Sequence, residues 1–78
     1  MYYFIETKNK YTYNYLKNKY GHSESSDISK IEGWVLEDNE MKLLPKELNY
    51  IIRNIPNNYQ TDIDEFKTDY WDGEFSFE

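Results

Sequence analysis

The residues that could act in nucleophilic catalysis lie together in one polar segment, residues 22–27. His22 is the only histidine of the chain, and Ser23, Ser25 and Ser26 follow it within four positions. A histidine acts as a general base when a second group orients it and a nucleophile lies within reach of its ring. None of these serines has the sequence pattern of a strand–turn–helix nucleophile. We therefore expect His22 to be an ordinary loop residue, assign no catalytic residue, and do not expect an enzyme.

Carboxylates could instead hold a hard cation. Asp62, Asp64 and Glu65 supply the oxygen ligands that Ca²⁺ and Mg²⁺ prefer. The segment lacks the internal glycine and the distal glutamate of a helix–loop–helix calcium site, and the three glycines of the chain form no phosphate-binding loop. A chain of 78 residues also seldom builds the cleft in which paired carboxylates cleave glycosides. We expect a solvated acidic cluster, no metal and no cofactor.

Lysines and tyrosines are mixed near the N-terminus, between residues 8 and 20. Rings that stack on bases and ammonium groups that meet phosphates are typical of single-strand nucleic-acid binders. The alternative is that the tyrosines form a core face while the lysines are solvated. We favour this alternative, because the rest of the chain would repel phosphate and Arg53 is the only arginine. The residues concerned are Lys8, Lys10, Tyr11, Tyr13, Tyr15, Lys17, Lys19 and Tyr20.

The net charge of the chain lies in its last eighteen residues. Residues 61–78 hold seven acids and one lysine, a sum of −6, whereas residues 1–60 hold eight acids and eight bases and sum to zero. Apolar residues are interleaved with the C-terminal acids, and a disordered acidic tail would be poor in them. These apolar residues are Ile63, Phe66, Tyr70, Trp71, Phe75 and Phe77. We therefore expect a folded acidic surface.

Carboxylates spaced along strands and a helix can imitate a nucleic-acid backbone. One DNA strand carries a negative charge every ~3.4 Å, and alternate residues of a β-strand lie ~5–7 Å apart. Such a row of carboxylates would enter a basic DNA-binding groove, and salt would release it. Exposed rings such as Trp71, Tyr59 or Trp34 would add an apolar anchor. The residues predicted to bind a partner are Glu37, Asp38, Glu40, Glu47, Asp62, Asp64, Glu65, Asp69, Trp71, Asp72 and Glu74.

The composition places the chain among small acidic proteins. Its 78 residues fit one domain, residues 1–78, and the 19% aromatic share argues for a core built from rings. No apolar run is long enough to cross a membrane, the N-terminus lacks a secretory pattern, and cysteine is absent. Asn, Lys, Tyr and Ile are abundant and Ala is missing, as A/T-rich bacterial or bacteriophage genomes encode. We expect a cytoplasmic protein of a bacterial host cell with no membrane contact.

Hydrophobic patterning predicts an α+β fold with one antiparallel sheet of four to five short strands and one amphipathic helix. Residues 2–7 are expected to form a strand. Residues 11–20 fit either a strand or a helix, and the strand is slightly favoured because Tyr and Asn are mediocre helix formers. Residues 31–37 and 41–44 are expected to pair as a hairpin around Asp38-Asn39.

The helix is expected at residues 45–55. Pro45 suits the first helical position, and Glu47 lies in the first turn, where the helix dipole favours an acid. Pro56 ends a run of four aliphatic residues at the spacing of one helix face. These are Leu48, Ile51, Ile52 and Ile55.

Two interpretations are open for residues 61–78. Asp72-Gly73 is a strong hairpin signal, and a two-residue turn there would pair Tyr70 with Phe75. Alternatively, a helix capped at Thr61 would turn its apolar residues inward. A helical turn near 62–65 followed by the hairpin would combine the two.

One local segment is similar to a known motif. Residues 43–56, Leu-Leu-Pro-Lys-Glu-Leu-Asn-Tyr-Ile-Ile-Arg-Asn-Ile-Pro, resemble the acidic helix of the phage uracil-DNA glycosylase inhibitor, which a Leu-Pro pair opens. Glu47 falls on an acidic position of that motif. In size and composition the chain also resembles anti-CRISPR and anti-restriction DNA mimics.

The charge pattern and the resemblance together predict a phage or mobile-element inhibitor. Its partner would be a host DNA-processing protein with a basic groove, a nuclease or a repair glycosylase, bound by acidic DNA mimicry and without direct nucleic-acid binding. Two alternatives stay open: an immunity or antitoxin-like protein that neutralises a basic toxin, and a single-strand nucleic-acid binder that uses residues 8–20. The oligomeric state also stays open.

Overall fold

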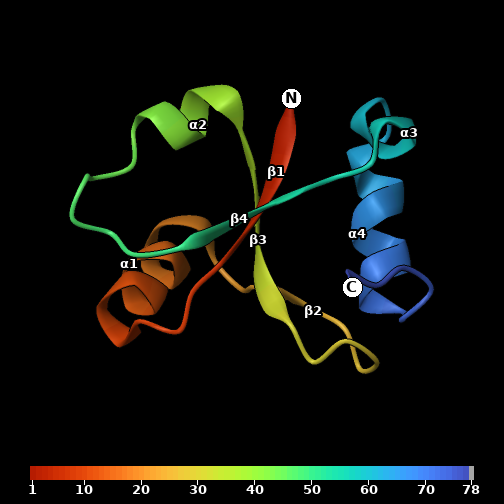
Figure 1. The fold of residues 1–78 in the computed structure, drawn as a ribbon, viewed down its shortest axis with the longest axis horizontal. Coiled ribbons are helices and arrows are strands. Elements are labelled where there is room, and N and C mark those ends of the chain that lie inside the picture. Colours follow the sequence, from red (N-terminus) through yellow and green to blue (C-terminus); the bar gives the residue numbers. More distant parts are fainter. Residues whose placement is uncertain (78) are drawn as a thin grey trace.

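Four antiparallel strands and four helices make up residues 1–77, the part of the chain that the computed structural model describes. In chain order they are β1 (Tyr2–Glu6), α1 (Lys10–Tyr20), β2 (Glu24–Ser25), β3 (Glu32–Glu37), α2 (Asp38–Lys42), β4 (Ile51–Asn54), α3 (Asn57–Gln60) and α4 (Ile63–Trp71). The strands form one sheet in the order β2-β3-β1-β4. Helices α1 and α2 lie on one side of this sheet and α3 and α4 on the other (Figure 1). The predicted α+β class, with a four-stranded antiparallel sheet, is therefore confirmed.

Strand β1 lies inside the sheet and pairs with both neighbours, so the strand predicted at residues 2–7 is confirmed. Ile5 pairs with Trp34 of β3, and Phe4 pairs with Arg53 of β4. Because successive residues of a strand point to opposite faces, Phe4 belongs to one face of the sheet and Ile5 to the other. β2 pairs only with the first two residues of β3.

Helix α1 covers one face of the sheet. Asn9 caps it by accepting a hydrogen bond from the backbone N–H of Thr12 at 2.9 Å, and Gly21, with φ of 87°, ends it. Leu16 is completely buried against the sheet. The indole N–H of Trp34 donates to the carbonyl oxygen of Gly21 at 3.0 Å and ties the end of α1 to β3. The buried residues of this core are Ile5, Leu16, Trp34, Leu36, Leu44 and Leu48.

Aromatic rings fill the opposite core, between the sheet and α4. The ring centroid of Phe4 lies 5.0 Å from those of Tyr70 in α4 and Phe77 in the segment after it. The buried hydroxyl of Tyr70 donates to the carbonyl oxygen of Ile31 at 2.5 Å, so this ring has its polar atom satisfied. Phe4, Ile55, Phe66 and Tyr70 are buried here, with Phe75 and Phe77 packed against them. The predicted ring-built core is therefore present.

The side chain of Gln60 continues the sheet where β4 ends. Its Oε1 accepts a hydrogen bond from the backbone N–H of Tyr2 at 2.7 Å, and its Nε2 donates to the carbonyl oxygens of Tyr2 and Ile55 at 3.0 and 3.1 Å. Across the same two strands, Arg53 and Glu6 form an ion pair with an Nη2–Oε1 distance of 2.6 Å. The Gln60 bonds fasten the start of β1 to α3, and the ion pair fastens the end of β1 to β4.

Residues 10–20 are helical, so the preference for a strand at 11–20 is wrong. The local end signals, Asn9 and Gly21, bound a helix whose inner side buries Leu16. Tyr13 of this helix meets the buried Trp34 edge-on, with 5.2 Å between the ring centroids. Such burial outweighs the mediocre helix propensity of Tyr and Asn.

The amphipathic helix predicted at residues 45–55 is also wrong. Residues 51–54 form β4, and residues 43–50 connect α2 to it. Leu48 and Ile55 are buried, but Ile51 and Ile52 are half exposed, as no helix core would leave them. β-branched residues favour strands, and β1 offers an open edge that this segment fills.

The hairpin predicted from residues 31–37 and 41–44 is half right. Its first strand corresponds to β3, but residues 38–42 form α2 in place of a turn and a second strand. Glu40 makes the difference, because its Oε1 accepts a hydrogen bond from the N–H of Glu37 at 3.0 Å and completes a capping box.

For the C-terminal segment the helical interpretation is confirmed and the Asp72-Gly73 hairpin is wrong. Asp62, one residue after the predicted Thr61, caps α4. Gly73 adopts φ of 81°, and its N–H donates to the carbonyl oxygen of Tyr70 at 3.2 Å. The Asp-Gly pair therefore ends a helix instead of joining two strands.

Candidate partner-binding surface

Carboxylates follow one another along the outer side of α4. An α-helix turns by about 100° per residue, which places four of these acids within an arc of about 140°. Phe66 and Tyr70 lie on the opposite side and are fully buried, so they fix the rotational setting of the helix. We call these four residues the α4 acidic row: Asp64, Glu65, Asp69 and Asp72.

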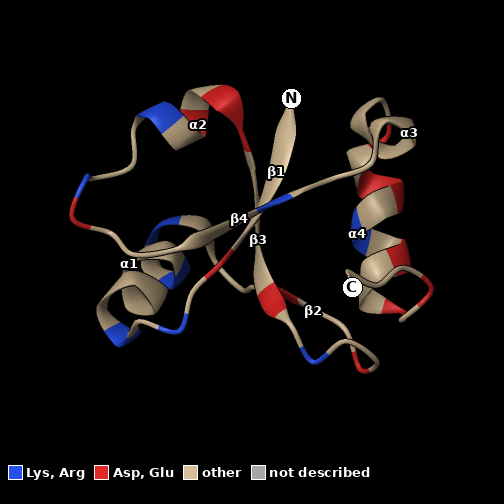
Figure 2. Cartoon of the chain, viewed as in Figure 1, with Lys and Arg blue, Asp and Glu red and all other residues tan. Residues whose placement is uncertain are grey.

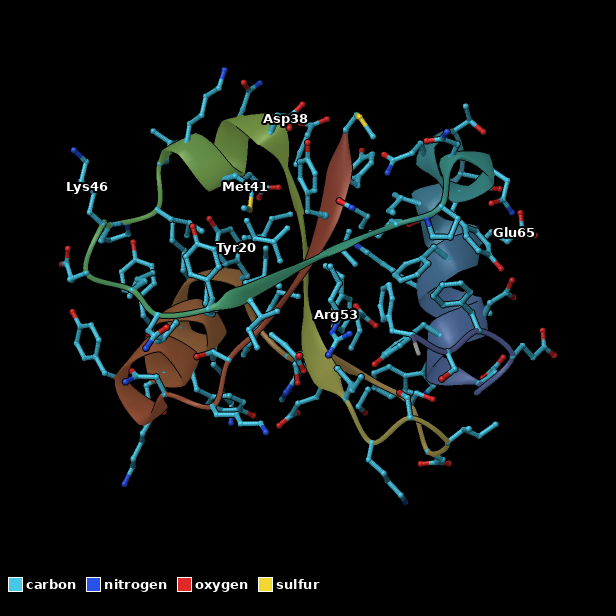
Figure 3. All side chains as sticks on the ribbon, in the orientation of Figure 1. Tyr20, Asp38, Met41, Lys46, Arg53 and Glu65 are labelled. Atoms are coloured by element: carbon cyan, nitrogen blue, oxygen red, sulfur yellow. The ribbon has the colours of Figure 1, made fainter. Side chains whose placement is uncertain are left out.

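The spacing of the α4 acidic row is close to that of phosphates. A rise of 1.5 Å per residue separates Asp64 and Asp72 by about 12 Å, or one carboxylate per ~4 Å of axis, compared with ~3.4 Å in a DNA strand. Within residues 1–77 no ion pair neutralises any member of the row. Acidic residues recur along α4 in Figure 2, and the side chain of Glu65 points away from the sheet in Figure 3. The row therefore offers an uncompensated negative charge to a partner.

Asp69 is held in place by a tyrosine. The hydroxyl of Tyr59 donates to its Oδ2 at 2.7 Å. This hydrogen bond, together with burial and the charges of Asp69, Glu65 and Glu74, raises the pKa of Tyr59 to about 12. Tyr59 therefore stays protonated and orients the carboxylate beside it.

Trp71 borders the α4 acidic row and is 54% exposed. A shallow hollow of about 240 Å³ lies beside it, lined by Glu24, Lys67, Thr68, Trp71 and Asp72. The pKa of Glu24 is raised, because partial burial of its carboxyl outweighs the opposite effect of the nearby Lys67. An exposed tryptophan beside a hollow and surrounded by charges has the composition of a protein-binding hot spot. Sequence reasoning missed Glu24, because only the tertiary fold brings β2 beside α4.

Glu37, Asp38 and Glu40 lie apart from the α4 acidic row. Glu37 and Glu40 form the capping box of α2. The carboxylate of Asp38 accepts a hydrogen bond from the N-terminal ammonium of Met1 at 2.9 Å, which lowers the pKa of Asp38. In Figure 2 the acidic start of α2 and the acidic side of α4 stand on opposite sides of β1. These three acids serve the start of a helix and do not lengthen the row.

The other predicted residues have separate positions. Glu47 is exposed in the connection between α2 and β4. The Oδ1 of Asp62 accepts a hydrogen bond from the N–H of Glu65 at 3.2 Å and so caps α4, while Glu74 is exposed just after the helix. Trp34 is only 3% exposed, so its expected role as an exposed anchor is wrong.

The N-terminal lysines lie on the opposite side of the molecule from the α4 acidic row. Residues 7–23 contain four lysines and no acid, and Figure 2 shows their positive charge on and around α1. Tyr13, Tyr15 and Tyr20 pack against the core, which leaves Tyr11 as the exposed ring of α1. Single-strand binding relies on several stacking rings, so this arrangement does not favour it.

His22 is exposed at the rim of a groove of about 300 Å³ beside Trp34 and Val35 of β3. No hydrogen bond joins its ring to another described side chain. Within residues 1–77 no group of three or more acidic or histidine side chains is arranged to hold a metal ion. None of the helices there is both long and apolar enough to cross a membrane.

Comparisons with known proteins return no match: no family model, no curated protein and no solved structure is similar to this chain. The segment that resembles the uracil-DNA glycosylase inhibitor, residues 43–56, forms a connection and β4 instead of a helix. The family resemblance stays a prediction, and the surface of α4 is the candidate for partner binding.

Proposed function

We propose that this protein is a phage or mobile-element inhibitor that occupies the basic groove of a host nucleic-acid-processing enzyme. Its contact surface would be the α4 acidic row together with Trp71. The observation that supports this most is one carboxylate per ~4 Å along a helix axis. Within residues 1–77 none of these carboxylates forms an ion pair, and they lie beside a tryptophan that is 54% exposed.

The distribution of charge supports binding in a defined orientation. Residues 57–77 hold six acids against Lys67, whereas residues 7–23 hold four lysines and no acid. A basic groove would attract the α4 side and repel the α1 side, which raises the rate of productive encounters at low salt.

Rigidity supports affinity. Phe66 and Tyr70 anchor α4, and the rings of Phe66 and Phe75 meet edge-on with 5.3 Å between their centroids. A helix already fixed in its binding conformation loses little conformational entropy on association. Trp71 would supply the desolvated contact that adds affinity beyond charge attraction.

The first test is an inhibition assay with purified enzymes: uracil-DNA glycosylase, an RNA-guided nuclease and a restriction endonuclease, each with its DNA substrate. We expect inhibition of one of them that DNA relieves competitively and that weakens between about 50 and about 500 mM NaCl. A pull-down from bacterial lysate extends the panel, and a captured enzyme must then be inhibited in the same way. Binding of a basic toxin alone, or of no DNA-processing enzyme at low salt, would overturn the proposal.

Matched variants separate the α4 acidic row from total charge. Asp64→Asn/Asp72→Asn and Asp27→Asn/Glu32→Gln both change the net charge from −6 to −4. We expect about a 10-fold loss of affinity from the first pair and less than about 2-fold from the second. Equal losses would mean that bulk charge, and not this row, is recognised.

The tryptophan has its own control. We expect Trp71→Ala to weaken binding by about 10- to 30-fold, as for an interface hot spot. Tyr11→Ala removes a ring that is 60% exposed on α1, on the opposite side of the sheet, and should leave affinity unchanged. A similar effect of both changes would contradict the assignment of Trp71.

A further inference from the structure

Strand β4 leaves one edge of the sheet open. It pairs with β1 on one side only. In Figures 1 and 3 it crosses in front of the sheet, and no other helix or strand of residues 1–77 lies over it. Ile51 and Ile52 are 52% and 51% exposed, and as neighbours in a strand they point to opposite faces. An edge strand with exposed aliphatic side chains is a template for a further strand.

The hydrogen bonds of β1 show which way its backbone groups point. The carbonyl oxygen of Met1 accepts a bond from the N–H of Asp38, on the side of β3. The N–H and carbonyl of Tyr2 bond to the side chain of Gln60, on the side of β4. Since this direction alternates along a strand, Phe4 also turns its backbone groups toward β4.

The same alternation applies to β4. Phe4 pairs with Arg53, so the N–H and carbonyl of Arg53 point inward to β1. Those of Ile52 and Asn54 then point outward, away from the sheet. The open edge therefore presents free donors and acceptors at two positions, with an exposed isoleucine at one of them.

The chemistry of this edge indicates what covers it. Arg53 is the only charged residue of β4, and Glu6 neutralises it in an ion pair of 2.6 Å. The guanidinium carbon also lies 5.7 Å from the centre of the Phe77 ring. By contrast, charged side chains, Glu40 and Lys67 among them, line the groove beside β3. The β4 edge is locally neutral and apolar, which fits an identical edge better than a charged partner.

We propose that two copies of this protein pair β4 against β4, antiparallel, about a twofold axis at Ile52, which doubles the four-stranded sheet to eight strands. Ile52 then lies opposite Ile52 of the partner subunit, with their outward backbone groups hydrogen-bonded to each other. Ile51 packs on the aliphatic stem of the partner's Arg53. In the alternative register, with its axis at Arg53, Ile52 would lie opposite the partner's Asn54, and the apolar contact between the two isoleucines would be lost.

This geometry predicts a weak dimer with a distinctive response to salt. The twofold axis stands perpendicular to the sheet, so α4 lies on the same side as α4 of the second copy, and α1 on the same side as its counterpart. Like charges face each other, and screening them should strengthen the dimer. A four-residue edge is smaller than a standard interface of ~1,600 Å², so we expect a Kd on the order of 100 µM.

Sedimentation of the full chain from about 10 µM to about 1 mM, at about 50 and about 500 mM NaCl, tests this proposal. We expect a dimer that forms with concentration and is at least about 2-fold tighter at the higher salt. Ile52→Lys should weaken it at least about 10-fold. Leu43→Lys, which adds the same charge at a residue that is 72% exposed, should not weaken it.

A backbone variant isolates the edge itself. Ile52→Pro removes an outward N–H, and we expect the bonds between β1 and β4 to stay in place, because proline is tolerated on an edge strand where its N–H would face solvent. We expect a folded monomer by circular dichroism and sedimentation. A wild-type monomer at 1 mM and high salt, a dimer that salt weakens, or equal effects of Ile52→Lys and Leu43→Lys would each overturn the proposal. Dimerisation can be tested independently of enzyme inhibition, because salt should strengthen the dimer and weaken the inhibition.

Discussion

At the scale of single residues, Tyr59 decides how one carboxylate of the α4 acidic row is presented. Its hydroxyl donates to Asp69 at 2.7 Å, so that carboxylate has a fixed direction while Asp64 and Asp72 stay exposed. A hydrogen bond from a neutral phenol to a carboxylate favours the protonated tyrosine. The row is therefore positioned partly by a ring from α3.

This contact predicts a measurable change in a tyrosine pKa. Asp69→Asn removes both the charged acceptor and the repulsion of the phenolate, so the pKa of Tyr59 should fall from about 12 toward its ordinary value of 10.0. Because the pKa of Tyr59 is raised in the folded state, its hydrogen bond to Asp69 stabilises the fold fully below pH 10. This contribution is lost as the pH rises to about 12. An NMR titration of the ring carbon Cζ measures it. Asp64→Asn, with the same change of charge, should leave the pKa near 12, and an unchanged value in Asp69→Asn would refute the bond.

The exposure of single residues could be predicted from the sequence in some cases and not in others. The exposure of Trp71 was predictable, because acids surround it in the chain. The burial of Trp34 was not, since it depends on Ile5 across the sheet and on the carbonyl of Gly21, which accepts from its indole N–H. Glu24 escaped prediction for the same reason, as its position beside Lys67 exists only after folding.

At the scale of elements, local pattern gave way to tertiary context in two places. Four aliphatic residues in 45–55 carry a helical spacing, yet β1 needs a neighbour, and β-branched Ile51 and Ile52 suit that strand. In residues 11–20 the mediocre helix propensity of Tyr and Asn suggested a strand, but Asn9 and Gly21 bound a helix there. The helix caps decided the structure of residues 11–20, and pairing with β1 decided that of residues 51–54, against the spacing of their apolar side chains.

The cap of α4 gives a test at this scale. Asp62→Ala should lower the free energy of unfolding by about 1 kcal/mol, because the N–H of Glu65 loses its acceptor. Thr61→Ala, at the position predicted from the sequence, should change it by less than about 0.3 kcal/mol. Urea denaturation measures both.

Asp62→Asn is the informative companion. Asparagine caps as well as aspartate does, so stability should be kept while one charge next to the α4 acidic row is removed. A loss of stability equal to that of Asp62→Ala would show that charge, and not capping, is the contribution of this residue.

At the scale of the whole molecule, charge is divided between the two sides of the sheet. The acids around α4 form no ion pair within residues 1–77, so they repel one another in the folded state. The negative charge that would attract a basic groove therefore also destabilises the free protein.

Salt should relieve this repulsion. Raising NaCl from about 20 to about 500 mM at low protein concentration should raise Tm by about 3 °C. Asp64→Asn/Asp72→Asn should show a smaller rise, and Asp27→Asn/Glu32→Gln the full one. Thermal scans monitored by circular dichroism measure this, and equal salt responses of the two variants would argue against repulsion centred on α4.

The amide of Gln60 has a consequence for how the molecule opens. Its bonds to Tyr2 and Ile55 bind the beginning of the chain to the layer that carries α4. Strands near a chain end commonly fray, and their amide protons then exchange with solvent faster than those of the core. Here the amide proton of Tyr2 should exchange slowly, together with those of α4, because it is released only when that layer detaches from the sheet.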